Sequence, residues 1–421
     1  GYWGIRRSEY LEHLCVGWRN PLCAALTAWL VVLVTRRVGA RRKEAWLAGA
    51  TYGVTTFAWP QARSSLSDVQ ATFFLFLAFH LLLRLRERCQ RGSRPTPIVL
   101  LACGAALGAA FLTRVTVTGA VLVLWLAALW HGANPRVGQA LECSPGSLRG
   151  PSAIAARTWL TLPLILALAL FFWTNWLRFG HAFESGYGPA LRQMGILQGL
   201  RVEALAGLLL SPGRGLLWFA PALLLCPLGL CWAWLRGHRF CPGLVLAVAL
   251  AILLPVCLVP GWHGAWTFGP RYLLPMLPFL WISVALVMTW GATGHALRYA
   301  CRLLFTVGAL VQASGVLVDT MSYHELAVRA ARFAWPDVGE PGDPESIRFE
   351  RMQWDFGLAT PFAHWRMLIH RARGLPERFP VHSVFGIRSA GSLQPTFLRD
   401  EGFRHLAWVD YRERLQRSLW W

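Results

Sequence analysis

Apolar residues along this chain are grouped into long runs that are separated by short polar segments. The runs lack the spacing of a helix that buries only one face. A helix needs about 20 apolar residues to cross a hydrocarbon core of roughly 30 Å. The pattern predicts an all-α fold, a polytopic transmembrane helical bundle of about ten spans, near residues 20–35, 45–60, 68–84, 97–113, 115–131, 158–177, 215–235, 241–260, 271–290 and 298–318.

The same pattern divides the chain into three parts. Residues 1–19 precede the first apolar run, residues 20–318 hold every predicted span, and residues 319–421 are polar and contain no further run. We expect the last part to be a folded C-terminal extramembrane tail. Within the second part, the loop at 178–214 contains the stretch Leu197–Leu210, whose apolar spacing suits a helix lying in the membrane interface.

Composition and charge support a membrane protein, since 55% of the 421 residues are apolar and 15% are charged. The net charge of +20 comes mostly from arginines in alternate loops, at 35–45, 84–94, 136–157, 236–239 and 298–302. Because cytoplasmic loops are enriched in basic residues, this alternation indicates topology and no nucleic-acid partner. The ten cysteines have no metal-ligand spacing, so the sequence predicts no metal site.

The loops between the basic ones are predicted to face outward, and they hold all the unusual polar residues. They include 60–68, the turn at Arg114, 175–214 and the tail. The alternation also places residues 1–19 outside, although the chain starts at Gly1 without a signal sequence. We therefore expect an upstream segment with at least one span that this sequence lacks, either because it is a fragment or because it is a processed product.

Several charged residues stand at the outer ends of predicted spans. Asp68 begins a span, where a carboxylate serves as a helix cap or lies at the mouth of a cavity. We expect Arg63 to lie close enough to keep Asp68 ionised. Arg114 stands between two spans with almost no loop, so it either reaches the head groups or faces a polar cavity. Arg214 follows a Ser-Pro-Gly turn, and an ordinary re-entry turn explains it equally well.

The stretch "GWHGAWTFGPRYLL" adds aromatic and hydrogen-bonding groups on the same side. Tryptophans at this depth, here Trp262 and Trp266, are typical of an aromatic belt, but the neighbouring glycines allow a ligand to approach the backbone. The guanidinium of Arg271 suits phosphate geometry, and His263 and Tyr187 are further hydrogen-bonding candidates. Together these residues predict a site for a phosphate-linked lipid whose tail stays in the membrane.

Four segments, in this order, resemble bacterial integral-membrane glycosyltransferases of the GT-C fold: "TFAWPQARSSLSD", "NWLRFGHAFESGYG", "LLLSPGRGLLWFAP" and "GWHGAWTFGPRYLLPMLPFL". These are polyprenyl-phosphate-sugar-dependent enzymes related to protein mannosyltransferases and aminoarabinose transferases. The resemblance runs from about residue 20 to residue 280. It implies a GT-C-like bundle in the bacterial inner membrane that, at its periplasmic face, moves a hexose or pentose from a polyprenyl-phosphate donor to a glycan, lipid or protein acceptor.

The resemblance also implies residue roles. Asp68 matches the acidic residue at the outer end of the family's early span, as a general base or a group that positions the acceptor. Arg271 matches the arginine of the Gly-Pro-Arg block, and Arg214 is the second candidate for phosphate neutralisation. The remaining candidates for substrate binding are Arg63, Arg114, Tyr187, Trp262, His263 and Trp266. The sequence indicates no cofactor, and whether a divalent metal assists stays open.

The family's catalytic aspartate lies in a first outer loop after a first span, and this chain contains neither. The base is therefore upstream of Gly1 or lost. Two hypotheses follow: an active transferase, or a non-catalytic GT-C-like subunit that binds membrane lipids or scaffolds a larger membrane complex. A transporter fits less well, because the sequence lacks the broken helices and midplane charges expected for one.

Overall fold

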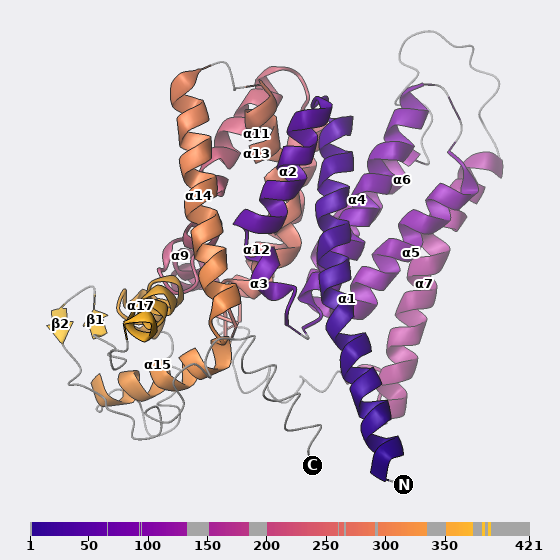
Figure 1. Cartoon of the computed structure of the whole chain (residues 1–421). Helices are drawn as coiled ribbons and strands as arrows, with labels where there is room; N and C mark the ends of the chain where they lie inside the picture. Colours follow the sequence, from indigo (N-terminus) through magenta and orange to yellow (C-terminus); the bar gives the residue numbers. More distant parts are fainter. Residues whose placement is uncertain are drawn as a thin grey trace.

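The computed structural model describes residues 2–64, 66–91, 93, 95–132, 151–184, 200–259, 261–264, 267–290, 294–334, 351–373, 381–383 and 386–388. Figure 1 shows the long helices side by side in one bundle, with the tail helices and a small hairpin near one end of α14. The bundle contains α1 (Tyr2–Arg37), α2 (Arg42–Thr55), α3 (Ala58–Gln61), α4 (Asp68–Gln90), α5 (Pro97–Thr113), η1 (Val115–Val117), α6 (Thr118–Gly132), α7 (Pro151–Phe179), α9 (Val202–Leu210), α10 (Leu216–Phe219), η4 (Pro221–Leu225), α11 (Cys226–Leu235), α12 (Phe240–Cys257), η5 (Arg271–Met276), α13 (Leu277–Trp290) and α14 (His295–Leu317).

The bundle confirms an all-α, multi-pass membrane fold, but the predicted count of ten spans is too high. Among the described residues, six helices are long and apolar enough to cross a membrane: Gly17–Arg37, Asp68–Gln90, Ile154–Phe179, Phe240–Cys257, Arg271–Thr289 and His295–Leu317. Three other apolar helices are shorter, at Pro97–Thr113, Val115–Trp130 and Pro221–Leu235. The run predicted at 45–60 is interrupted, because Thr56 is extended and separates α2 from α3.

The most buried of the six long helices is the one that contains α13, and α7 is the least buried. The indole N–H of Trp281 in α13 donates to the carbonyl of Ala48 at 3.0 Å, and the ring meets Tyr52 edge-on. On the other side of the bundle, Gly104 of α5 lies against α7, where a Cβ atom would come within 2.1 Å of the carbonyl oxygen of Leu160. Small residues at such a contact let two helices approach closely in a membrane.

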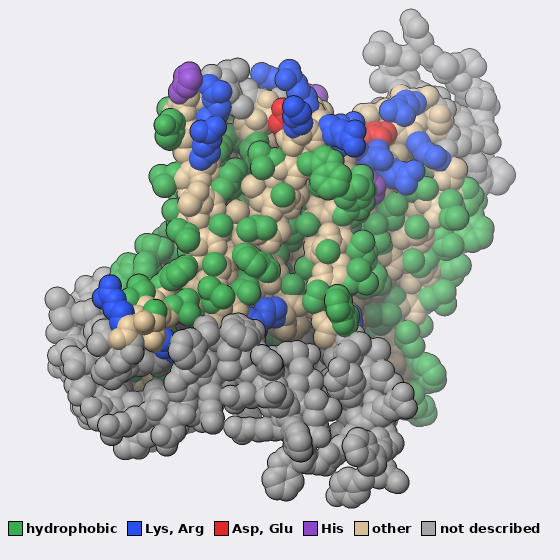
Figure 2. Space-filling view, viewed as in Figure 1, with side chains coloured by type: hydrophobic (Ala, Val, Ile, Leu, Met, Phe, Trp, Pro, Cys, Tyr) green, Lys and Arg blue, Asp and Glu red, His purple; other side chains and the backbone are tan. Residues whose placement is uncertain are grey.

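The two ends of the bundle differ in charge. Figure 2 shows apolar side chains over the middle of the bundle and most of the visible Lys and Arg side chains at the end opposite the tail helices. We call this end the basic end, and it comprises the helix ends and loops at 36–43, 84–91, 236–239 and 294–302. The opposite end, which we call the site end, carries Asp68, Arg114 and Arg271 at the ends of their helices. Four of the five predicted basic loops therefore lie at one end of the bundle, and most of the fifth, at 136–157, lies outside the described residues.

The tail follows α14 and packs on the site end. It contains α15 (Thr320–Ala334), α17 (Thr360–Ala372) and an antiparallel hairpin of β1 (Val381–Ser383) and β2 (Gly386–Arg388). Its own apolar cluster includes Tyr323, Leu358 and Met367. The indole of Trp365 donates to the carbonyl of Leu310 at 3.1 Å, which ties α17 to α14. The predicted interfacial helix corresponds in position to α9, and the predicted boundary at residue 19 lies inside α1.

Candidate functional site

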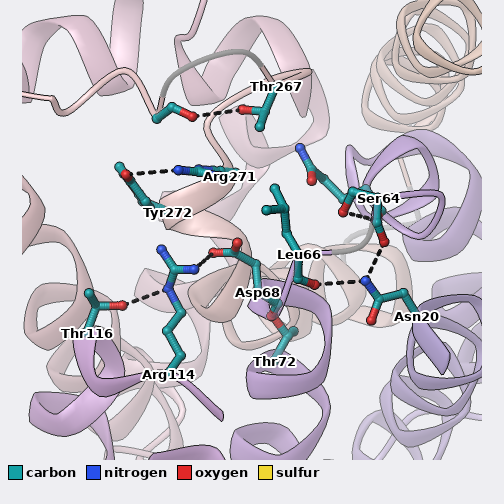
Figure 3. A network of polar contacts seen from close by, with 12 residues as sticks. Asn20, Ser64, Leu66, Asp68, Thr72, Arg114, Thr116, Thr267, Arg271 and Tyr272 are labelled. Carbon is teal, nitrogen blue, oxygen red and sulfur yellow. Dashed lines mark hydrogen bonds and ion pairs between the residues drawn. The ribbon is translucent and has the colours of Figure 1, made fainter. Parts of the chain in front are cut away.

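Asp68 is the first residue of α4, and its side chain is completely buried. The loop before it is held by Asn20 of α1, whose side-chain amide donates to the carbonyls of Ser64 and Leu66 at 2.5 and 2.8 Å (Figure 3). A buried carboxylate is costly unless an opposite charge compensates it. The fold supplies that charge from another part of the chain.

The partner of Asp68 is Arg114, whose Nη1 lies 2.9 Å from Oδ1 of the carboxylate. Arg114 is extended at the point where α5 ends, and its Nε donates to the hydroxyl of Thr116 at 2.8 Å. The expectation that Arg63 neutralises Asp68 is wrong. Although Arg63 is close in sequence, its guanidinium donates to the carbonyl of Val316, at the end of α14. Arg114 therefore faces a polar site and does not simply reach for the head groups.

A second arginine completes the charged group. Arg271 begins η5, and its charge acts on Asp68 together with that of Arg114. Its Nη2 donates to the hydroxyl of Tyr272 at 3.1 Å (Figure 3). The guanidinium carbons of Arg114 and Arg271 lie 5.1 and 4.8 Å from the centroid of the Tyr272 ring. Because a ring face attracts cations, Tyr272 helps to keep two like charges close together.

The charged group retains unused hydrogen-bonding capacity. Within the described part of the chain, Oδ1 of Asp68 is engaged by Arg114, whereas Nε of Arg271 is buried without a hydrogen bond. Buried polar atoms are nearly always hydrogen-bonded, so such a cluster calls for an explanation. One carboxylate and two guanidinium groups leave a net charge of +1 among Asp68, Arg114 and Arg271. An anion with hydrogen-bonding oxygens suits this arrangement.

Arg214 occupies a different environment. Its side chain is completely buried, and its Nη1 donates to the carbonyls of Thr267 and Gly269, the latter at 3.1 Å. Its Nη2 lies 3.3 Å from Nε2 of His324 in α15. Burial lowers the pKa of Arg214 to about 10, which still leaves it charged at neutral pH. Arg214 thus holds the loop that leads into Arg271.

The other candidates lie around this group. Trp262 is buried, and its ring lies so close to Gly207 of α9 that a Cβ atom there would overlap it, so it packs in the core. Burial, followed by the charges of Arg214 and Arg271, lowers the pKa of His263 to about 3, and this histidine is neutral at pH 7. The candidates Tyr187 and Trp266 lie outside the described residues. Within the described ranges, no group of three or more His, Cys, Asp or Glu side chains could hold a metal ion.

Sequence reasoning missed three residues of this region. Tyr272 directly follows Arg271, and Thr116 lies two residues after Arg114. The third is Gln61, whose amide donates to the carbonyl of Phe268 at 2.6 Å and so joins α3 to the loop before Arg271. Polar residues next to a candidate arginine are a usable indication in the first two cases. Nothing in the sequence links Gln61 to Phe268, because more than two hundred residues separate them.

Residues 9–181 match the family model described as dolichyl-phosphate-mannose-protein mannosyltransferase. This is a glycosyltransferase family of the GT-C fold, so the match confirms the resemblance that the sequence motifs indicate. The matched segment includes Asp68 and Arg114 and ends before Arg214 and Arg271. No curated protein and no solved structure matches the chain.

Proposed function

We propose that the protein is a membrane glycosyltransferase that moves a sugar from a polyprenyl-phosphate donor to an acceptor at the site end. The observation that carries the proposal is the group of Asp68, Arg114 and Arg271, in which one buried carboxylate and two partly buried guanidinium groups give a net charge of +1. The match to a family named for a lipid-phosphate-linked mannose supports this class of donor. We assign the site end and the tail to the periplasmic face of a bacterial inner membrane, because the basic loops lie at the other end.

Charge balance supports a phosphate-linked donor. A sugar joined to a polyprenyl chain through phosphate is a phosphodiester with one negative charge, which the net charge of +1 at the site offsets. When the bond between the sugar and the phosphate breaks, the phosphate oxygen takes the bonding electrons and gains negative charge. Arg114 and Arg271 are then placed to stabilise the leaving group, because preformed cations act most strongly where charge develops.

Asp68 has two roles in this proposal. Its ion pair with Arg114 orients that guanidinium, and its carboxylate is the proton acceptor for the incoming hydroxyl or amine. The acceptor atom forms a bond to the sugar carbon as the bond to phosphate breaks, and its proton passes to the carboxylate. Arg214 takes no direct part, since its described contacts are with the loop at 267–269 and with His324.

The experiment is transfer of radiolabelled sugar in vesicles that contain the purified protein. A set of polyprenyl-phosphate hexoses and pentoses supplies the donor, and a membrane extract supplies the acceptor. Asp68→Asn and Arg271→Ala are each expected to lower transfer about a hundredfold, corresponding to about 3 kcal/mol of transition-state stabilisation. Arg298→Ala, an exposed arginine at the basic end, is the control and is expected to leave transfer unchanged.

Two outcomes contradict the proposal. If both site variants are folded and transfer at the wild-type rate, the site assignment is wrong. If the wild-type protein binds the labelled donors but transfers none of them to any acceptor, the non-catalytic lipid-binding subunit becomes the better description. If Arg271→Ala loses transfer but Asp68→Asn does not, the donor site is supported and the base is a residue other than Asp68.

A further inference from the structure

A pocket of about 790 Å³ lies at the basic end of the bundle. It is enclosed by the end of α1 and the loop after it, the last turns of α4, and the turn between α11 and α12. Arg86 in this pocket lies 18 residues along α4 from Asp68, which is about 27 Å at 1.5 Å per residue. The pocket is therefore separate from the candidate transferase site, and its role is independent of the proposed function.

The pocket is strongly basic. Four arginines and one glutamate line it, which gives a net charge of +3: Arg37, Arg86, Arg236, Arg239 and Glu87. The single carboxylate is already engaged, because Glu87 forms an ion pair with Arg37. Like charges that converge on one cavity repel each other unless an anion joins them. The excess charge therefore points to an anionic ligand.

Aromatic rings hold two of the guanidinium groups in place. The guanidinium carbon of Arg86 lies 4.0 Å from the centroid of the Phe240 ring, and that of Arg236 lies 5.0 Å from the Trp232 ring. Stacking occupies the flat face of a guanidinium group and not its N–H edge, which is the edge that binds oxyanions. In addition, Nε of Arg37 is buried without a hydrogen bond among the described residues. Planar N–H donors in this arrangement suit phosphate oxygens.

The remainder of the lining is mostly apolar, with Gln90 and His238 as its other polar side chains. Leu83, Leu286 and Pro242 are buried beneath the charged mouth, while Trp234 and Leu235 at the end of α11 are exposed beside it. Exposed tryptophan at a helix end is typical of the membrane interface. A charged mouth above apolar walls, at the depth of the head groups, matches a lipid better than a fully water-soluble molecule.

We propose that this pocket binds the phosphate of an anionic phospholipid in the leaflet that contacts the basic end. A soluble phosphate compound shares the same recognition chemistry, and the lipid is favoured because of the apolar walls and the position at the membrane interface. Such a site anchors three helix ends to one head group and fixes the bundle in the bilayer. It requires neither the donor lipid nor the transferase reaction.

The test is native mass spectrometry of the full chain in detergent with phosphatidylglycerol, phosphatidylcholine or inorganic phosphate added. The pocket variant is Arg86→Gln with Arg239→Gln. The control is Arg298→Gln with Arg302→Gln, which removes the same charge from exposed positions at the same end. A melting curve without lipid checks folding. Arg239→Gln alone, at an exposed position, serves if the pocket variant does not fold.

We expect the wild-type protein to bind phosphatidylglycerol at least tenfold more tightly than phosphatidylcholine. Each basic residue near a charged lipid surface contributes about fivefold, so the pocket variant should lose about thirtyfold in affinity and Arg239→Gln alone about fivefold. The control should change by less than about twofold. An equal loss in the pocket variant and the control, or no preference for the anionic lipid, overturns the proposal. Displacement of the lipid by millimolar inorganic phosphate, with binding independent of acyl chains, overturns the lipid assignment in favour of a soluble phosphate.

Discussion

The Ser-Pro-Gly-Arg-Gly block and the Gly-Pro-Arg block each place an arginine just before an apolar helix, yet the two side chains differ in what they contact. Arg214 is completely buried, and its Nη1 donates to the carbonyls of Thr267 and Gly269. Arg271 is only partly buried, and it lies beside a carboxylate and a tyrosine. An arginine whose Nη1 donates to two backbone carbonyls holds a loop, whereas a partly exposed arginine beside a carboxylate can receive a ligand.

The two arginines are nevertheless connected. The loop at 267–269, which Arg214 holds, leads directly into Pro270 and Arg271. Gln61 of α3 also donates to this loop, at the carbonyl of Phe268. Arg214 therefore helps to position Arg271 through this loop. Variants at Arg214 should mainly lower stability, whereas variants at Arg271 should mainly lower transfer.

The largest effect is expected for Arg214→Ala. This change removes the donor to two buried carbonyls, and each unsatisfied group costs roughly 1–3 kcal/mol. We expect the free energy of unfolding to fall by about 3 kcal/mol, with transfer lost as a consequence, measured by chemical denaturation followed by tryptophan fluorescence. Arg271→Ala is the matched comparison and should change stability by less than about 1 kcal/mol. If Arg214→Ala is as stable as the wild type, Arg214 does not hold the loop, and the distinction between the two arginines is wrong.

The second-largest effect is expected from acid, which should lower the stability of the region around Arg214. His364 of α17 is buried, and burial lowers its pKa to about 3; the pKa of His324 beside Arg214 is lowered in the same direction for the same reason. An unfolded histidine titrates near 6.5, so between pH 6.5 and 3 the unfolded chain binds more protons than the folded one. The contribution of these neutral histidines to the free energy of unfolding is thus fully present above pH 6.5, and it falls as the pH drops below that value. For His364 the loss at pH 5 is about 2 kcal/mol.

Hydrogen exchange of residues 360–372 at pH 7.5 and pH 5 measures this loss. His364→Gln keeps a donor for the carbonyl of Ser314, which Nδ1 of His364 faces at 3.1 Å, and it should reduce the dependence on pH. If the variant shows the full wild-type dependence, the titration belongs to another group.

A smaller effect on stability and transfer is expected from Gly264→Ala, a change next to Arg271. Gly264 has a φ of +76°, and an added Cβ atom would come within 3.1 Å of Cγ of Arg271. The backbone strain and the displaced arginine should together cost about 1.5 kcal/mol of stability and lower transfer about tenfold. Gly261→Ala is the matched control in the same turn, because a Cβ atom there meets no other atom within 4 Å. Equal effects of the two changes would show that the Arg271 side chain is not held in this position.

The smallest effect is expected for Tyr272→Phe. The change removes the hydroxyl that accepts from Nη2 of Arg271 at 3.1 Å and keeps the ring that both arginines approach. A typical hydrogen bond contributes a net of about 1 kcal/mol, so transfer should fall about fivefold. Tyr272→Leu removes the ring as well and should reduce transfer further. If the two variants are equally impaired, the ring does not help to hold the arginines.

The sequence predicts which charged residues lie at the same end of the bundle better than it predicts the contacts between them. Asp68, Arg114 and Arg271 are ionisable residues at the ends of apolar runs, where charge is costly, and the structure brings them together. Arg63 is misplaced by sequence reasoning, since a separation of five residues from Asp68 says nothing of the turn that directs it to Val316. The count of spans fails for a similar reason: residues such as Thr56 break an apolar run without changing its hydropathy.

The most direct measurement is a density map of the purified protein with a bound polyprenyl phosphate, examined at the site end. The proposed function predicts density for the phosphate in contact with the guanidinium groups of Arg114 and Arg271, next to the carboxylate of Asp68, with the polyprenyl chain running out between the helices. A phosphate that binds elsewhere, with the space beside Asp68 unchanged, would contradict the assignment of these residues to the donor site.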